Sequence, residues 1–179
     1  MDVTYYVTSI GLVRHAKAHV SAVDCPTNDS LLDRPDFRKL FKQIYDSSGP
    51  TLPFTQRREY GGWLYLNPTT DTLIYKPWPT NGASPCSINP APYDTTISPA
   101  WLVAAPHSHP VDSGTVVPPA VCPQAPLGGI VGRGPSNPDD NLAQSQLLPV
   151  YAVDSKTIYR TTGPGLHTEW PRVSACTIF

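Results

Sequence analysis

The sequence has few charged residues, and they form no run of either sign. Charged residues make up 15% of the 179-residue chain, and 13 Lys and Arg residues nearly balance 14 Asp and Glu residues, for a net charge of -1. Proteins that bind nucleic acid or an anionic membrane usually carry a basic patch or stripe. We therefore expect no nucleic-acid partner.

Long apolar segments and export signals are also lacking. No window of the sequence holds 18 consecutive apolar residues, so we expect no membrane span. The first four residues, Met1 to Thr4, do not provide a basic region followed by an apolar stretch and a cleavage site. This start predicts that the chain carries no signal peptide.

The cysteine motifs of several zinc proteins are missing. The four cysteines contain no C-x-x-C pair, which argues against a structural zinc knot, and the Pro-Cys-x-x-Cys part of the zinc deaminase signature is absent. Four cysteines allow three disulfide connectivities. We favour Cys86 with Cys122, because this pair would join the two proline-rich loops on either side of a histidine-bearing strand; Cys25 and Cys176 are the other two cysteines.

Proline, by contrast, is abundant. The chain has 22 prolines, concentrated between Pro77 and Pro149. Since proline removes a backbone hydrogen-bond donor, this region predicts extended loops rather than long helices or inner strands. The apolar content of 40% still suffices for a core, and the length fits one domain over residues 1–179.

A helix is expected near the start of the chain, over residues 13–20. It would carry His15 and His19 at the i, i+4 spacing of zincin metalloproteases. In a zincin, a glutamate directly follows the first histidine and serves as general base, and Ala16 stands there instead. We interpret both histidines as surface or half-buried residues.

The clearest helix is expected between Asp33 and Gly49. Asp33 can cap its start, Pro35 suits its first turn, and Gly49 ends it. One face is apolar and predicts core packing, whereas Arg38 would lie on the solvated face; the apolar face consists of Phe37, Leu40, Phe41, Ile44 and Tyr45.

The remaining pattern predicts short strands and one more helix. We expect a hairpin of residues 58–66 and 72–75, a strand over residues 97–105, and a final hairpin of residues 150–153 and 157–160. Ser136 or Asn137 would cap a helix that turns Leu142 and Leu147 inward and that Pro149 stops. This order of elements predicts an α+β fold, a sheet covered by helices, with its core at about residues 33–160.

Two histidines at the end of the central strand form a candidate metal site. His107 and His109 are separated by one residue, so their side chains would point to the same face of a strand. Asp139, returning from the start of a distant helix, would complete a set of three ligands. Three protein ligands leave a fourth position open, as in catalytic zinc sites.

The order of these residues resembles a known motif. Glu59, then His107-Ser108-His109-Pro110, then Ser136-Asn137-Pro138-Asp139 resembles the JAMM motif of the JAB/MPN metalloprotease fold. The residues around Glu59, before His107 and from Leu148 to Arg160 are similar to the JAB-like, DUF4329-type domains of bacterial polymorphic and RHS-type toxins. The resemblance covers roughly residues 37–160. It implies a cytidine-deaminase-like mixed β-sheet flanked by helices, with long proline-rich loops.

The resemblance also implies a role for each residue of the motif. His107, His109 and Asp139 would bind Zn²⁺, with Asp140 as an alternative to Asp139. Glu59 would be the general base that moves a proton from water to the leaving amine. Ser136 would donate a hydrogen bond to the oxyanion of the tetrahedral intermediate.

One departure from the compact motif is a long insertion. Residues 110–135, 26 residues, separate His109 from Ser136. The proline- and glycine-rich part, residues 111–135, would be either a lid or substrate-selecting loop beside the metal, or a surface excursion.

Together these features predict a zinc-dependent peptidase or isopeptidase of the JAMM type. It would act as a secreted toxin or effector domain that is delivered into a target cell. Its partners would be a protein or peptide substrate, such as a ubiquitin-like protein or a peptidoglycan peptide, and a cognate immunity protein. The alternatives are a catalytically silent MPN-like binding scaffold and a zinc hydrolase of peptidoglycan cross-links.

Overall fold

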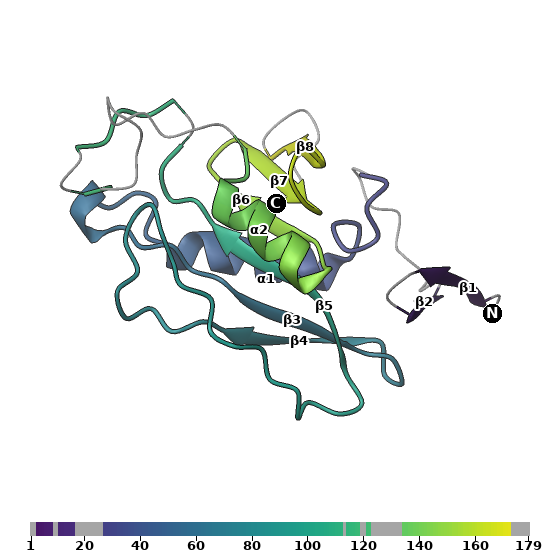
Figure 1. Ribbon diagram of the computed structural model, residues 1–179. Coiled ribbons are helices and arrows are strands. Elements are labelled where there is room, and N and C mark those ends of the chain that lie inside the picture. Colours follow the sequence, from purple (N-terminus) through teal and green to yellow (C-terminus); the bar gives the residue numbers. More distant parts are fainter. Residues whose placement is uncertain are drawn as a thin grey trace.

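The computed structural model describes residues 3–8, 11–16, 27–112, 114–118, 121–122 and 134–172. The elements follow one another as shown in Figure 1, and their bounds are β1 Val3–Thr8, β2 Gly11–Ala16, α1 Pro35–Ser47, a 3-10 helix Phe54–Gln56, β3 Gly62–Asn67, β4 Thr72–Pro77, β5 Trp101–Ser108, α2 Asn137–Gln146, β6 Val150–Val153, β7 Thr157–Thr161 and β8 His167–Pro171.

Six strands form one mixed sheet in the order β4-β3-β5-β6-β7-β8. Only β5 and β6 pair in parallel, and α2 lies on the connection between them; the other neighbours pair antiparallel. β1 and β2 form a separate antiparallel pair. The predicted α+β class with a mixed sheet and flanking helices is confirmed, and β8 extends the sheet beyond the core boundary expected at residue 160.

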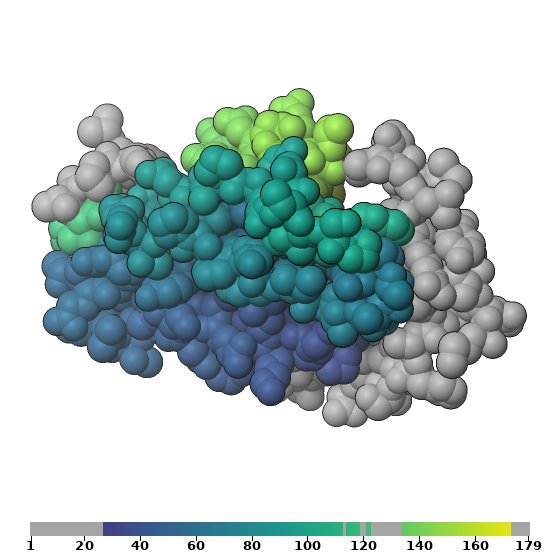
Figure 2. Space-filling view, turned by 90° about the horizontal axis from the view of Figure 1, so that it is seen from below, coloured from purple at the N-terminus to yellow at the C-terminus, as the bar shows by residue number. Residues whose placement is uncertain are grey.

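The two helices pack against opposite faces of this sheet. Phe37 and Phe41 of α1 share a core with Leu64 and Ala104, whereas Ala143 of α2 shares a core with Trp63 and Ala105. This separation follows from the alternation of side chains along β3 and β5. In Figure 2, the purple-blue residues that include α1 lie at one edge, teal residues from the middle of the chain cross the centre, and the green residues that include α2 lie at the opposite edge.

Helix α1 begins and packs somewhat differently from the prediction. Pro35 stands in the first turn and Gly49, with φ 64°, follows the last one, as predicted. The N-cap is Arg34 rather than Asp33, because the Asp33 carboxylate instead accepts hydrogen bonds from Thr27 N and Oγ1 at 2.8 and 2.9 Å. Arg38 is buried rather than solvated, since its guanidinium donates to the Leu32 carbonyl and to Asp33.

The predicted disulfide between Cys86 and Cys122 is confirmed. Around it, Val111, Val117 and Cys122 form a small buried core that Phe54 helps to cover. The described part of the insertion is therefore packed onto the body of the protein. Residues 113, 119–120 and 123–133 of the insertion lie outside the described residues, so the choice between a lid and a surface excursion stays open.

Two sequence-based expectations for helices were wrong. Residues 13–16 belong to strand β2 rather than to a helix, and His15 pairs with Thr4 of β1 in its ladder; His19 lies outside the described residues. The β-branched and aromatic residues of β1 offer a strand partner, which overrides the helical pattern. Leu147 is exposed rather than inward-facing, because it ends α2 in the left-handed conformation.

None of the helices in the described part of the chain is long and apolar enough to cross a membrane. The assignment of residues 1–179 to one domain stays a prediction.

Candidate metal centre

His107 and His109 lie at the end of β5, on the face of the sheet that α2 covers. His107 is two residues beyond the buried Ala105, which packs in the α2-side core, so strand alternation points its ring to that face. Only 3% of the His107 side chain and 17% of the His109 side chain are exposed. Their Nε2 atoms are 3.0 Å apart, which confirms the expectation that both rings point the same way.

Asp139 reaches the two histidines from the first turn of α2. Its Oδ1 atom lies 3.2 Å from His107 Nε2, and its Oδ2 atom lies 3.7 Å from His109 Nε2. A capping box fixes the carboxylate, because Ser136 N donates to Asp139 Oδ2 at 2.7 Å and Ser136 Oγ accepts from Asp139 N. The three side chains form a group that could hold a metal ion.

The neighbouring Asp140 is not part of this group. It is buried on the other side of the helix start, where its Oδ1 atom accepts a hydrogen bond from Thr161 Oγ1 at 2.6 Å and lies 2.8 Å from His167 Nε2. These contacts tie α2 to β7 and β8. Of the two aspartates considered from the sequence, the geometry therefore supports Asp139 as the candidate ligand, in line with the predicted set.

Glu59 lies just before the isolated antiparallel bridge that joins the start of β3 to the end of β5. Gly61 forms a bridge with His107, and Ser108 N donates to Tyr60 O at 2.7 Å. Continuing this register by two residues pairs Glu59 with His109, and strand alternation then puts its side chain on the face of the two histidines. Glu59 is only 7% exposed, and the charge of Asp139 acts on its carboxyl group, so a buried acid lies near the candidate ligands.

Burial and neighbouring charges shift the pKa values of the ionisable residues in this site. Burial and, next, the negative charge of Asp139 raise the pKa of Glu59 well above its ordinary value. Burial and the neighbouring His107 lower the pKa of His109 to about 4, against the opposing attraction of Asp139. For Asp139, burial alone would raise the pKa, but both histidines and the Ser136 hydrogen bonds outweigh it and lower the pKa. Without a cation, the cluster thus favours neutral His109 and ionised Asp139, the forms that bind metals.

The Ser136 hydroxyl lies at the site, although it makes a different contact from the predicted one. Its Oγ atom donates to Asp139 Oδ2 at 2.7 Å, as part of the N-cap of α2. The structure therefore assigns it an orienting contact with a candidate ligand. Its role as an oxyanion donor stays a prediction.

The sequence did not identify the supporting contacts that Ser108, Gly61 and Trp78 make around His107. The Ser108 hydroxyl accepts from Tyr60 N at 2.9 Å, which reinforces the ladder opposite the histidines. Gly61 lies so close to His107 that an added Cβ would be 2.6 Å from the His107 Cβ and 2.6 Å from the ring of Trp78. The only sequence signal was the pair of glycines in a strand, which often marks a close approach of another chain segment.

Comparison with protein-family models, with curated proteins and with solved structures found no match to this chain. The motif resemblance therefore rests on the residues that carry it. What is established independently is an α+β sheet fold and a buried cluster of His107, His109 and Asp139 that could hold a metal ion.

We predict that Gly61→Ala weakens metal binding by about tenfold or more, which is the scale of losing a residue that orients a ligand. The new methyl group would collide with His107 and Trp78 and displace the imidazole. Titration with Co²⁺, followed by its visible absorption, measures the affinity. Gly62→Ala is the matched control, because its methyl group would collide with Tyr75 and the Lys76 carbonyl on the β4 side. Both variants should lose about 1–3 kcal/mol of stability, and equal metal affinities would contradict the prediction.

We also predict that Glu59→Gln stabilises the metal-free protein at neutral pH. Since the folded-state pKa of Glu59 is raised, the folded protein binds more protons than the unfolded chain, and its stability falls as pH rises above the unfolded-state pKa of about 4.5. Glutamine removes this cost, so the variant should gain about 1 kcal/mol or more at pH 7. Urea unfolding between pH 4 and pH 8 measures the difference, which should shrink toward the acid end; a constant difference would show that the charge of Glu59 is not its cause.

Proposed function

We propose that this protein is a zinc metallopeptidase or isopeptidase of the JAMM type, which hydrolyses an amide bond with metal-activated water. The observation that carries the proposal is the meeting of His107, His109 and Asp139, from β5 and α2, near the buried Glu59, which lies two residues before the bridge of Gly61 to His107. These four residues are the ones whose order along the chain resembles the motif.

The chemistry and spacing of the donors fit zinc. Two imidazoles and one carboxylate are one of the known ligand sets of catalytic zinc, and donors about 2.0–2.2 Å from a tetrahedral ion lie about 3.3–3.6 Å apart. The separations here are 3.0, 3.2 and 3.7 Å, which bracket that range. Small adjustments of the three side chains would therefore suffice to hold the ion.

The residues around the ligands supply the other roles. When bound, zinc would lower the pKa of a coordinated water to about 7 and would polarise the scissile carbonyl. Glu59 takes the proton of the attacking water and passes it to the leaving amine. The raised pKa of Glu59 suits this second step, because a protonated carboxyl group is then accessible nearer to neutral pH.

Ser136 donates to the developing oxyanion by turning its hydroxyl away from Asp139. The carboxylate would not be released by this movement, because the Ser136 main-chain N–H also donates to Asp139 Oδ2, at 2.7 Å. One residue can therefore orient a ligand through its backbone while its side chain serves the substrate.

The biological setting in the proposal is that of a secreted toxin or effector domain with a protein or peptide substrate and a cognate immunity protein. This part is supported by the sequence resemblance over residues 37–160. Candidate substrates are ubiquitin-like proteins and peptidoglycan peptides, which both contain amide or isopeptide bonds.

The first test is the metal content of the purified protein. Elemental analysis should find about one zinc per chain. Removal of a residue that supports a ligand lowers metal affinity by about 10- to 100-fold. The zinc affinity of His107→Ala and of Asp139→Ala should fall by more than this, because each variant removes a ligand. His167→Ala is the matched control, because this histidine contacts Asp140 outside the cluster and should leave zinc in place. Full zinc retention in both ligand variants would refute the site.

The second test separates the enzyme from a silent scaffold. Zinc-loaded protein is incubated with ubiquitin chains and, separately, with peptidoglycan fragments, and new amino termini are quantified. Glu59→Gln should keep the zinc but reduce hydrolysis by about 100- to 10,000-fold, the usual contribution of a general base. Unchanged hydrolysis in this variant would remove Glu59 from the mechanism, and the absence of zinc-dependent hydrolysis with both substrates would favour the scaffold.

A further inference from the structure

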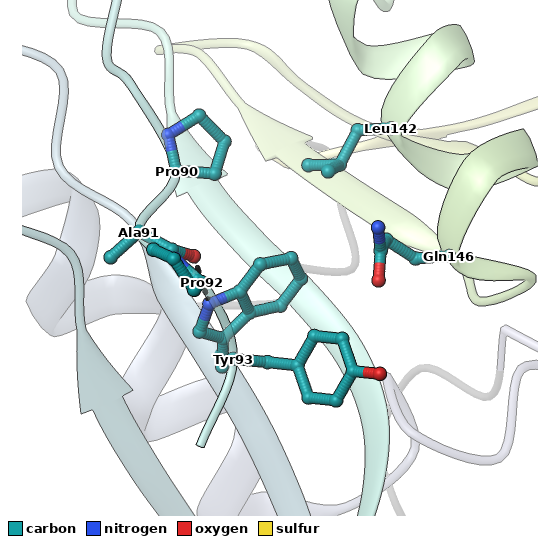
Figure 3. A pocket seen from close by; sticks show the side chains of 7 residues that line it. Pro90, Ala91, Pro92, Tyr93, Leu142 and Gln146 are labelled. Carbon is teal, nitrogen blue, oxygen red and sulfur yellow. Dashed lines mark hydrogen bonds between the residues drawn. The ribbon is translucent and has the colours of Figure 1, made fainter. Parts of the chain in front are cut away.

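A pocket of about 370 Å³ lies between α2 and the loop that follows β4. Trp63 of β3, the loop residues 90–93, and Leu142 and Gln146 of α2 line it. Figure 3 shows the loop residues on one side and the two α2 side chains on the other, with the space between them. This volume is within the range of pockets that bind small molecules or side chains.

Helix α2 joins this pocket to the candidate metal centre. Asp139, Leu142 and Gln146 are spaced i, i+3 and i+7, so they share one face of the helix. At a rise of 1.5 Å per residue, Leu142 and Gln146 lie about 4.5 and about 10.5 Å along the helix axis from Asp139. The same helix face therefore presents a metal ligand at its start and the pocket wall farther along.

The sheet makes the same connection independently. Trp63 is two residues beyond Gly61, the bridge partner of His107, which corresponds to about 7 Å along the strand. A row of rings covers this distance: Trp78 lies 6.4 Å from His107 and 5.4 Å from Trp63, and Tyr93 lies 6.1 Å from Trp63, between ring centroids.

The lining of the pocket is apolar and held in place. None of the seven described residues that line it carries a charge. The indole N–H of Trp63 already donates to the Ala91 carbonyl at 2.7 Å, as the dashed line in Figure 3 marks, and Asp94 N donates to Tyr65 Oη at 2.8 Å, which anchors the loop. A sugar would find few polar partners here, whereas an aromatic or large aliphatic side chain would be desolvated by rings and prolines.

We infer that this pocket is a substrate-specificity site that binds an aromatic or large aliphatic side chain of an extended peptide whose scissile carbonyl lies at the metal. The inference rests on the proposed function. The pocket begins about 5–10 Å from the metal ligands along α2, and an extended chain advances about 3.3–3.6 Å per residue. The side chain that enters it therefore belongs to a residue about two or three positions from the scissile bond.

The first experiment tests the pocket without any metal. The indole N–H resonance of Trp63, assigned with Trp63→Phe, is followed by NMR during titration with N-acetyl-phenylalaninamide, N-acetyl-aspartamide or N-acetylglucosamine. The phenylalanine compound should shift this resonance saturably, and the other two should not. Absence of any shift with the phenylalanine compound, or an equal shift with the sugar, would overturn the inference.

The second experiment tests the link between the pocket and the metal. Zinc-loaded protein is titrated with peptide hydroxamates that carry Phe or Asp two or three residues from the hydroxamate. The Phe peptide should bind about 10- to 100-fold more tightly, as expected for burial of one large apolar side chain. In Leu142→Asp the two peptides should bind about equally tightly. The preference for the Phe peptide should persist in the control Leu147→Asp, which changes an exposed leucine at the end of the same helix.

Gln146→Trp is a second pocket variant, which fills the pocket with a large side chain from the last turn of α2 instead of placing a charge in it. It should also abolish the preference for the Phe peptide. A preference that survives in both pocket variants, with zinc and hydroxamate still bound, would overturn the inference. If no hydroxamate binds because the protein takes up no zinc, the proposed function fails. The metal-free titration then decides by itself whether the pocket accepts an apolar side chain.

Discussion

The short antiparallel contact between residues 59–61 and residues 107–109 is the feature on which the candidate site depends. Ser108 holds Tyr60 through its main-chain N–H and its hydroxyl, and Gly61 permits the close approach of His107. Continued by two residues, this register would set Glu59 opposite His109. A single ladder thus positions two candidate ligands and the candidate base, and α2 only has to bring Asp139 to them.

Desolvation shifts the pKa values of the site residues and also lowers the stability of the metal-free protein. Glu59 and His107 are almost fully buried, and the pKa of Glu59 is raised by that burial. A cation in the cluster would offset the like charges of Glu59 and Asp139, so metal binding and folding should stabilise each other. In the metal-free protein, the like charges of Glu59 and Asp139 disfavour the cluster. The buried contacts of Asp140 with Thr161 and His167 hold the start of α2 in place against this repulsion.

Much of the local structure could be predicted because its cause is local. Strand alternation placed His107 and His109 together, and the capping pattern placed Ser136 and Asp139 at a helix start. The predictions failed where a contact outside the expected helix decides: Arg38 is buried because it reaches the Leu32 carbonyl, and residues 13–16 form a strand because β1 pairs with them. A single sequence does not reveal such partners before the chain is folded.

The sequence by itself determined the donor types, their order along the chain and the elements that carry them, since these follow from side-chain chemistry and backbone periodicity. Only the tertiary structure showed that Asp140 turns to Thr161 and His167, that Gly61 and Trp78 lie against His107, and that an apolar pocket lies farther along α2 from the site. The physical reason is that each of these facts depends on the packing of β3, β5 and α2, which are separated along the chain and meet only through the sheet.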